Sequence, residues 1–125
     1  MILVDTSVLI DYFRNKDTVV DSLLETEELA TCGIVLAELL HGVRSDNEKT
    51  EVSEAIADFN WIAIGDSLWR KVGENLNLIK KGGLTIPFQD AVIATICITN
   101  DLFLLTNDKH FEDIGKILPG LKLHK

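Results

Sequence analysis

The sequence lacks the features that direct a protein into or across a membrane. None of its apolar stretches is long enough to span a bilayer. The apolar N-terminus is interrupted by Asp5 and Asp11 and has no basic segment before it, which argues against a signal peptide. We therefore expect no membrane association and a cytoplasmic location.

Cysteine and histidine are also scarce, which limits the kinds of metal site to be expected. The two cysteines, Cys32 and Cys97, are far apart and lie in apolar segments, as is typical of buried, reduced thiols. The three histidines show no metal-ligand spacing. His110 lies close to Asp108 and could stand at the rim of a site, although a solvated loop histidine is the more common situation. No zinc site is expected.

Basic residues are outnumbered, with 12 Lys and Arg against 20 Asp and Glu and a formal net charge of −8 at pH 7. This balance argues against nonspecific binding to a phosphate backbone, which needs positive charge. It fits either an enzyme whose acids hold cations or a protein with a basic partner. The chain also lacks the G-x-S-x-G elbow, the P-loop and the dinucleotide fingerprint, so the enzyme classes built on them are excluded.

The chain is rich in acidic residues, and four of them lie just after, or near, short apolar runs. These candidates for chemistry are Asp5, Glu38, Asp90 and Asp108. Four converging carboxylates would repel one another strongly unless a cation lay between them. In so acidic a chain, each could instead cap a helix or face water. Position alone leaves both interpretations open.

Short apolar runs alternate with helical patterns along the whole chain. We expect strands at residues 2–4, 29–32, 61–64 and 103–105, with a short fifth at 121–123. We expect helices at 8–13 (capped by Thr6 and Ser7), 19–24, 35–43, 47–59, from 66 or 67 to a Gly82-Gly83 cap, and from Pro87 to 98. Strands separated by such helices imply an α/β fold with a parallel sheet and right-handed crossovers, in one domain of residues 1–125.

In such folds the functional crevice lies outside the carboxyl ends of the strands. Asp5 and Asp108 each follow an expected strand, and Asp90 lies in the first turn of a helix, where the helix dipole stabilises an anion. Glu38 is inside a helix, and its spacing does not place it. Carboxylates without histidine or cysteine partners suit Mg²⁺ or Mn²⁺, which could promote hydrolysis of a phosphodiester or a phosphomonoester. The carboxylates alone do not indicate which of these two reactions takes place.

The segments around the four acids form a set of motifs that spans nearly the whole chain. They are VDTSVLI (residues 4–10), AELLHG (37–42), IPFQDAVIA (86–94) and LTNDKHF (105–111). In this order and spacing they resemble the four motifs of PIN domains, particularly the VapC toxins of toxin–antitoxin pairs. The resemblance implies a three-layer α/β/α sandwich with a central parallel sheet of four to five short strands. It also implies Mg²⁺- or Mn²⁺-dependent endoribonuclease activity, homodimers and inhibition by a VapB-like antitoxin.

The resemblance further implies roles for individual residues. Asp5 and Asp90 would be direct metal ligands, Asp108 would complete or support the metal shell, and Glu38 would orient the attacking water. Thr6 and Thr106 would hold carboxylates through their hydroxyls, although each could equally be a cap. The alternative is an acidic PIN-like module that binds a partner without catalysis.

The binding surfaces are less constrained by the sequence. Arg14, Lys16 and Arg44 are expected near the site, either as contacts to RNA or as ordinary solvated charges. No aromatic platform for single strands is apparent, so the RNA sequence preferred cannot be read. Asn107 could add a polar contact at the site. An antitoxin groove, or simply core, is expected from the helical face with Tyr12, Phe13, Val20 and Leu24.

Overall fold

The computed structural model describes residues 1–124, which form a five-stranded sheet of parallel strands in the order β3-β2-β1-β4-β5. The strands are β1 (Ile2–Val4), β2 (Leu29–Cys32), β3 (Asn60–Ile62), β4 (Phe103–Leu105) and β5 (Lys122–Leu123). The helices are α1 (Thr6–Arg14), α2 (Val19–Thr26), α3 (Gly33–Gly42), α4 (Asp46–Ile56), α5 (Asp66–Lys81), α6 (Phe88–Thr99) and α7 (His110–Ile117).

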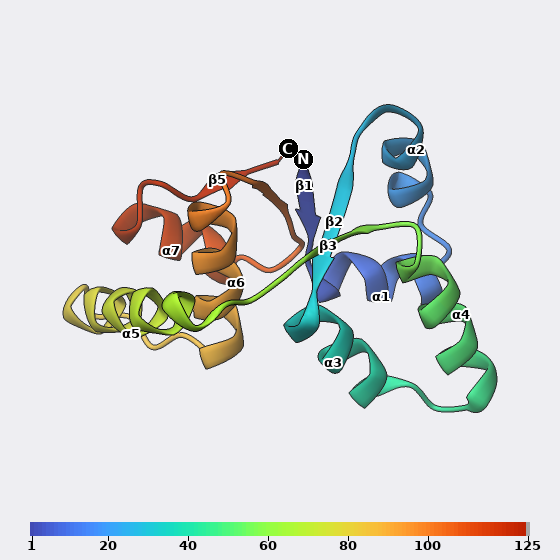
Figure 1. Ribbon diagram of the computed structural model, residues 1–125, viewed down its shortest axis with the longest axis horizontal. Coiled ribbons are helices and arrows are strands. Elements are labelled where there is room, and N and C mark those ends of the chain that lie inside the picture. Colours follow the sequence, from blue (N-terminus) through green and yellow to red (C-terminus); the bar gives the residue numbers. More distant parts are fainter. Residues whose placement is uncertain (125) are drawn as a thin grey trace.

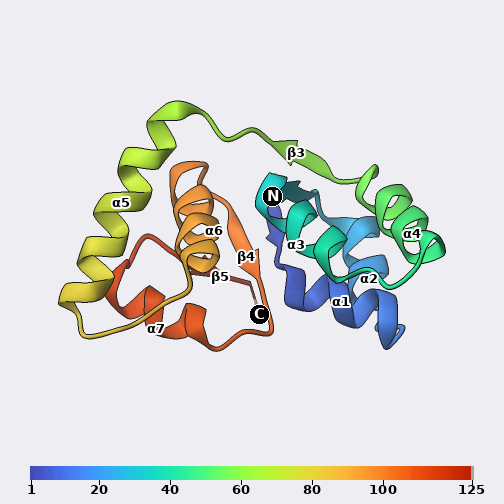
Figure 2. The ribbon, with the colours of Figure 1, turned by 90° about the horizontal axis from the view of Figure 1, so that it is seen from below.

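Helices cover both faces of the sheet (Figure 1). On one side α1 contacts α2 and α3, and α3 contacts α4. On the other side α5, α6 and α7 pack against one another, and the chain after β3 passes from the first group of helices to the second (Figure 2). This is the three-layer α/β/α sandwich with a central parallel sheet that the sequence resemblance implies.

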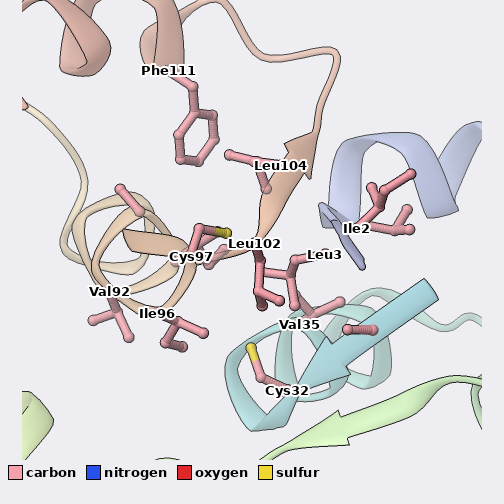
Figure 3. Close-up of a cluster of buried hydrophobic side chains, with 14 of the residues drawn as sticks. Ile2, Leu3, Cys32, Val35, Val92, Ile96, Cys97, Leu102, Leu104 and Phe111 are labelled. Carbon is pink, nitrogen blue, oxygen red and sulfur yellow. The ribbon is translucent and has the colours of Figure 1, made fainter. Parts of the chain in front are cut away.

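The core lies where β1 and α6 are covered from all sides. Every residue of β1 is buried, and so is every residue of α6 from Ala91 to Cys97. Figure 3 shows side chains from β1, β4 and α3 gathered beside those of α6. Each buried aliphatic side chain of this kind contributes about 1.5–3 kcal/mol to stability. The rigid centre of the molecule is therefore the strand that leads into Asp5.

The two cysteines lie in this core. Both are free and buried, and burial holds the pKa of the Cys97 thiol far above its usual value. A thiol with so high a pKa is not an effective nucleophile or metal ligand, because both roles need the thiolate. The expectation of buried, reduced cysteines is confirmed.

The start of α1 differs from the sequence prediction. Asp5 occupies the N-cap position, and its backbone carbonyl accepts hydrogen bonds from the N–H groups of Val8 and Leu9. Thr6 and Ser7 are the first helical residues, so their prediction as caps is wrong. Their hydroxyls are instead directed to acidic side chains, as described below.

Other differences lie at the ends of elements and in one helix. β3 covers residues 60–62 rather than 61–64, and α3 and α4 are each displaced by one or more residues at their ends. α7 has no counterpart among the expected helices; it is held by Phe111 and Ile114, which are completely buried. The cap predicted for α5 is confirmed, with Gly83 at φ +84° and the Leu84 N–H bonded to the Ile79 carbonyl at 3.2 Å.

Within residues 1–124, every helix is too short or too polar to cross a membrane.

Candidate active site

The site lies at the carboxyl end of the sheet, where the strand order changes direction. β1 pairs with β2 on one side and with β4 on the other, although β4 comes much later in the chain. Such a switch point is where open parallel sheets form a crevice. Asp5 follows β1, and its N–H bonds to the carbonyl of Leu105, the last residue of β4, at 2.9 Å. This pairing brings the first and last motifs together.

Asp5 is the most buried of the four acids, with only 5% of its surface exposed. Its Oδ2 accepts a hydrogen bond from Ser7 Oγ at 2.8 Å and another from Thr106 Oγ1 at 2.7 Å. The carboxylate also stands at the N-terminal end of α1, where the helix dipole favours an anion. These contacts hold one oxygen of Asp5 in a single position.

Thr106 connects Asp5 to the fourth acid. Besides its bond to Asp5, the Thr106 hydroxyl oxygen accepts the backbone N–H of Asp108 at 3.0 Å. The next residue, Asn107, donates its backbone N–H to Ser7 Oγ at 3.0 Å and its side-chain amide to Asp11 Oδ2 at 2.8 Å. The loop after β4 is thus attached to the first two turns of α1. The sequence predicted a contact from Asn107 but did not assign Ser7 or Asp11 to the site. The only signal was that Ser7 and Asp11 are four residues apart, on one face of α1.

Glu38 reaches the same place from α3. Thr6 Oγ1 donates a hydrogen bond to Glu38 Oε1 at 3.3 Å. The pKa of Glu38 is raised, first by partial burial and then by the negative charge of Asp5 and of Asp90, while the Thr6 hydrogen bond acts in the opposite direction. The fold thereby places the one acid whose position the sequence spacing left open.

Asp90 and Asp108 meet at a histidine. The ring nitrogen Nδ1 of His110 lies 3.3 Å from Asp90 Oδ2 and 3.3 Å from Asp108 Oδ1. Asp108 Oδ1 also accepts the backbone N–H of His110 at 2.9 Å, which fixes the start of α7 against this loop. His110 is therefore in contact with two of the acids rather than isolated in a solvated loop.

The charges of the cluster act on one another. The pKa of Asp90 is raised by burial and by the charges of Asp108 and Asp5, while the hydrogen bond from His110 lowers it. A divalent cation would remove this repulsion, and carboxylate oxygens are the donors that Mg²⁺ and Mn²⁺ prefer. One ligand atom from each of Asp90, Asp108 and His110 lies within 4.8 Å of the others. The donor set fits a divalent metal.

The family follows from the match of nearly the whole chain to one family model. The model of the PIN domain matches residues 2–117. The chain belongs to the PIN domain family. Its relatives include Ribonuclease VapC1 of Methanocaldococcus jannaschii, which is 32% identical, with 98% of this chain and 86% of the relative covered. Ribonuclease VapC11 of Mycobacterium tuberculosis is 26% identical, with 94% and 93% covered.

Solved structures share the fold of this PIN domain. A VapBC2 complex from Rickettsia felis bound to promoter DNA contains a chain with a TM-score of 0.85 at 22% identity, covering 99% of this chain and 98% of that one. The DNA-bound VapBC of Salmonella typhimurium gives a TM-score of 0.84 at 19% identity, covering 98% and 96%. At such identities the likeness is one of fold.

A groove of this PIN domain begins beside Glu38 and runs between α1, α3 and α4; we call it the α1–α3–α4 groove. Its apolar lining consists of Ile10, Phe13, Leu39, Val43 and Val52, and its charged lining of Arg14, Glu38, Glu48 and Glu51. Of the helical face expected to form a groove, Phe13 lines this one, whereas Val20 is buried in the core. The groove thus connects an apolar surface to one of the four acids.

The expected basic rim makes contacts within the protein. Arg14 donates to the Gly42 carbonyl at 2.8 Å, and Arg44 pairs with Glu48 at 3.4 Å. The first contact connects the end of α1 to the end of α3, and the second joins the residue before the Ser45 cap to the first turn of α4. Two of the three expected RNA contacts thus already have structural partners.

Phe88 of the third motif forms an aromatic pair with Trp69, although no aromatic platform was expected. The rings of Trp69 on α5 and Phe88 on α6 are parallel, with 6.5 Å between centroids and 5° between planes. Both remain about half exposed. The pair therefore forms a small apolar surface where α5 and the start of α6 meet. Sequence periodicity does not reveal it, because the two residues come from different helices.

Proposed function

We propose that this PIN domain is the toxin of a type II toxin–antitoxin pair and that it hydrolyses RNA phosphodiester bonds with the help of Mg²⁺ or Mn²⁺. The observation that carries the proposal is the convergence of four carboxylates from four separate segments. Thr6 bonds to Glu38, and Thr106 joins Asp5 to the backbone N–H of Asp108. The charges of Asp5 and Asp108 act on Asp90, and those of Asp5 and Asp90 act on Glu38. The choice of RNA is supported by the relatives named above, which are VapC ribonucleases. We propose that residues 1–125 act as a single domain in the cytoplasm.

The residues divide into those that hold the metal and those that act around it. Asp5, Asp90 and Asp108 would hold the ion, which when bound polarises the phosphate and lowers the pKa of an attacking water. Thr106 keeps Asp5 and the Asp108 backbone in register. These contacts are present before any substrate binds, so the protein does not have to organise them during the reaction.

Glu38 is suited to take a proton from the attacking water. Its Oε1 is occupied by the Thr6 hydroxyl, which leaves Oε2 to accept the proton. Its raised pKa makes it a stronger base than a fully solvated carboxylate. Thr6 then serves to orient the side chain, and a residue with this role is expected to affect turnover more than RNA affinity.

We propose that an antitoxin occupies the α1–α3–α4 groove. The groove has apolar walls and carries three acids, so its partner should present an apolar helix face or extended segment with a basic residue near Glu38. Such a residue would neutralise the site and block access of RNA. A homodimer, as expected from the sequence resemblance, remains part of the proposal and can be tested by analytical ultracentrifugation.

The central experiment compares purified wild-type protein with Asp90→Asn on a pool of cellular RNA, with Mg²⁺ or Mn²⁺, followed by sequencing of the 5′ ends produced. Loss of a residue that merely supports a metal ligand costs about 10–100-fold, so loss of a direct ligand should lower cleavage by more than about 100-fold. Asp58→Asn, which changes an exposed acid after α4, is the matched control and should cleave normally.

Two results would contradict the proposal. A folded Asp90→Asn protein that cleaves as well as the wild type would remove the acids from catalysis. A wild-type protein that binds divalent metal and an antitoxin but cleaves no RNA would favour the alternative, a binding module without catalysis.

A further inference from the structure

His110 stands in an unusual position between two of the acids. Its side chain is about half exposed, at 53%, and its backbone N–H is fixed on Asp108 Oδ1 at 2.9 Å. Nδ1 lies equally far, 3.3 Å, from Asp90 Oδ2 and from Asp108 Oδ1. A single N–H cannot point at both oxygens, and 3.3 Å is longer than the roughly 2.9 Å typical of such hydrogen bonds. Hydrogen bonding alone therefore explains this arrangement poorly.

The arrangement matches the spacing of ligands around a metal. Oxygen and nitrogen ligands at about 2.1 Å from an ion are separated by about 3.0 Å in octahedral geometry and by about 3.4 Å in tetrahedral geometry. Both distances from Nδ1 fall between these values. The three ligand atoms lie within 4.8 Å of one another, and an ion could contact all of them after small movements of these side chains.

We propose that His110 is a direct metal ligand, through Nδ1, together with Asp90 and Asp108, and that it makes the site prefer Mn²⁺ over Mg²⁺. An imidazole nitrogen adds affinity for transition-metal ions, whereas Mg²⁺ strongly prefers oxygen ligands. The inference rests on the proposed function only in assuming that the acid cluster binds a divalent cation. It makes His110 a residue that determines which cation the site selects.

The competing explanation is that a protonated His110 serves as a positive charge between two carboxylates. The two explanations predict opposite effects of removing the ring. If His110 is a ligand, removing its ring weakens Mn²⁺ binding and leaves Mg²⁺ binding nearly unchanged. If His110 is instead a positive charge in the place that the ion would take, removing its ring strengthens the binding of both ions.

The test measures Mn²⁺ affinity by electron paramagnetic resonance titration, and Mg²⁺ affinity by competition, without RNA. The proteins are the wild type, His110→Ala and His110→Phe, with His41→Ala as a matched control that removes an exposed imidazole at the end of α3. We expect Mn²⁺ affinity to fall at least about tenfold in both His110 variants, with Mg²⁺ affinity within about twofold of the wild type. Thermal melting checks the fold, which Phe111 and Ile114 of α7 should maintain.

A second, spectroscopic measurement reports the bond itself. Electron spin echo modulation of bound Mn²⁺ should show coupling to a directly bound nitrogen in the wild type and in His41→Ala, and none in His110→Ala. Absence of this coupling in the wild type, equal changes in the affinities of both ions, or failure of the wild type to bind Mn²⁺ would overturn the proposal. RNA cleavage is measured separately. RNA cleavage without nitrogen coupling would refute only the assignment of His110 as a ligand. Nitrogen coupling without RNA cleavage would refute only the proposed ribonuclease activity.

Discussion

Replacing Thr106 with valine removes the hydroxyl that joins two segments of the site while keeping the shape of the side chain. The hydroxyl donates to Asp5 Oδ2 at 2.7 Å and accepts the Asp108 N–H at 3.0 Å. A hydrogen bond to a charged group contributes about 1.5–3 kcal/mol, and a neutral one about 0.5–1.5 kcal/mol. The variant should therefore lose about 2–4 kcal/mol of unfolding free energy. For a domain of this size, 1 kcal/mol lowers Tm by about 4 °C, so the expected decrease is about 8–16 °C.

Two assays measure the effect. Denaturant unfolding of the metal-free protein reports the stability. RNA cleavage should fall about 10–100-fold, because both segments proposed to bind the metal lose a shared support. Thr106→Ser keeps the hydroxyl and should behave much more like the wild type in both assays.

A second control makes the same chemical change elsewhere. Thr31 lies in β2, and its buried hydroxyl has no hydrogen-bond partner within residues 1–124. Thr31→Val should stabilise the protein by about 1–3 kcal/mol, because it removes an unsatisfied buried polar group. The reasoning fails if Thr106→Val is as stable as the wild type, or if the two valine variants shift Tm in the same direction.

Three further predictions concern charge, the groove and the core. The pKa values of Glu38 and Asp90 are raised by burial and by neighbouring carboxylates. The stability that these two side chains contribute is therefore fully present below the ordinary carboxyl pKa of about 4. It is lost as the pH rises through the raised pKa values. Unfolding curves of metal-free protein at increasing pH should show Glu38→Gln losing less stability than the wild type; parallel curves would contradict this. Ile10→Glu puts a charge on the apolar wall of the α1–α3–α4 groove and should weaken antitoxin binding at least tenfold in a calorimetric titration. Unchanged affinity would mean that the antitoxin binds to another surface. Phe111→Ala should cost about 3–5 kcal/mol of unfolding free energy, since the ring is completely buried; a cost below about 1 kcal/mol would mean that α7 is not held by this side chain.

The layers of the fold could be predicted because each strand and most helices carry their own pattern. β1 and β4 read as short continuous apolar runs, and such runs are typical of strands buried on both faces. Asp5 follows β1 directly and Asp108 comes a few residues after β4, so parallel pairing alone was enough to bring them to one edge. Their proximity is seen in the structure, while their role in catalysis stays a prediction.

Glu38 and His110 could not be placed in the same way. A side chain inside a helix points wherever the docking of that helix turns it, and the docking of α3 depends on contacts with α1, α4 and α6 that local periodicity does not encode. α7 was not predicted, and only two of its residues, Phe111 and Ile114, are buried. Because α7 was not predicted, the position of His110 in the first turn of α7 was not predicted either.

The bond between Thr106 and Asp5 joins residues 101 positions apart. This separation has a consequence for the time course of synthesis. At a translation rate of about 5–20 residues per second, about 5–20 s pass between the addition of Asp5 and that of Thr106. The α1–α3–α4 groove, in contrast, is lined by residues no later than Val52. A ribosome therefore adds every residue of the surface proposed for the antitoxin well before it adds the last residues of the site proposed to cut RNA.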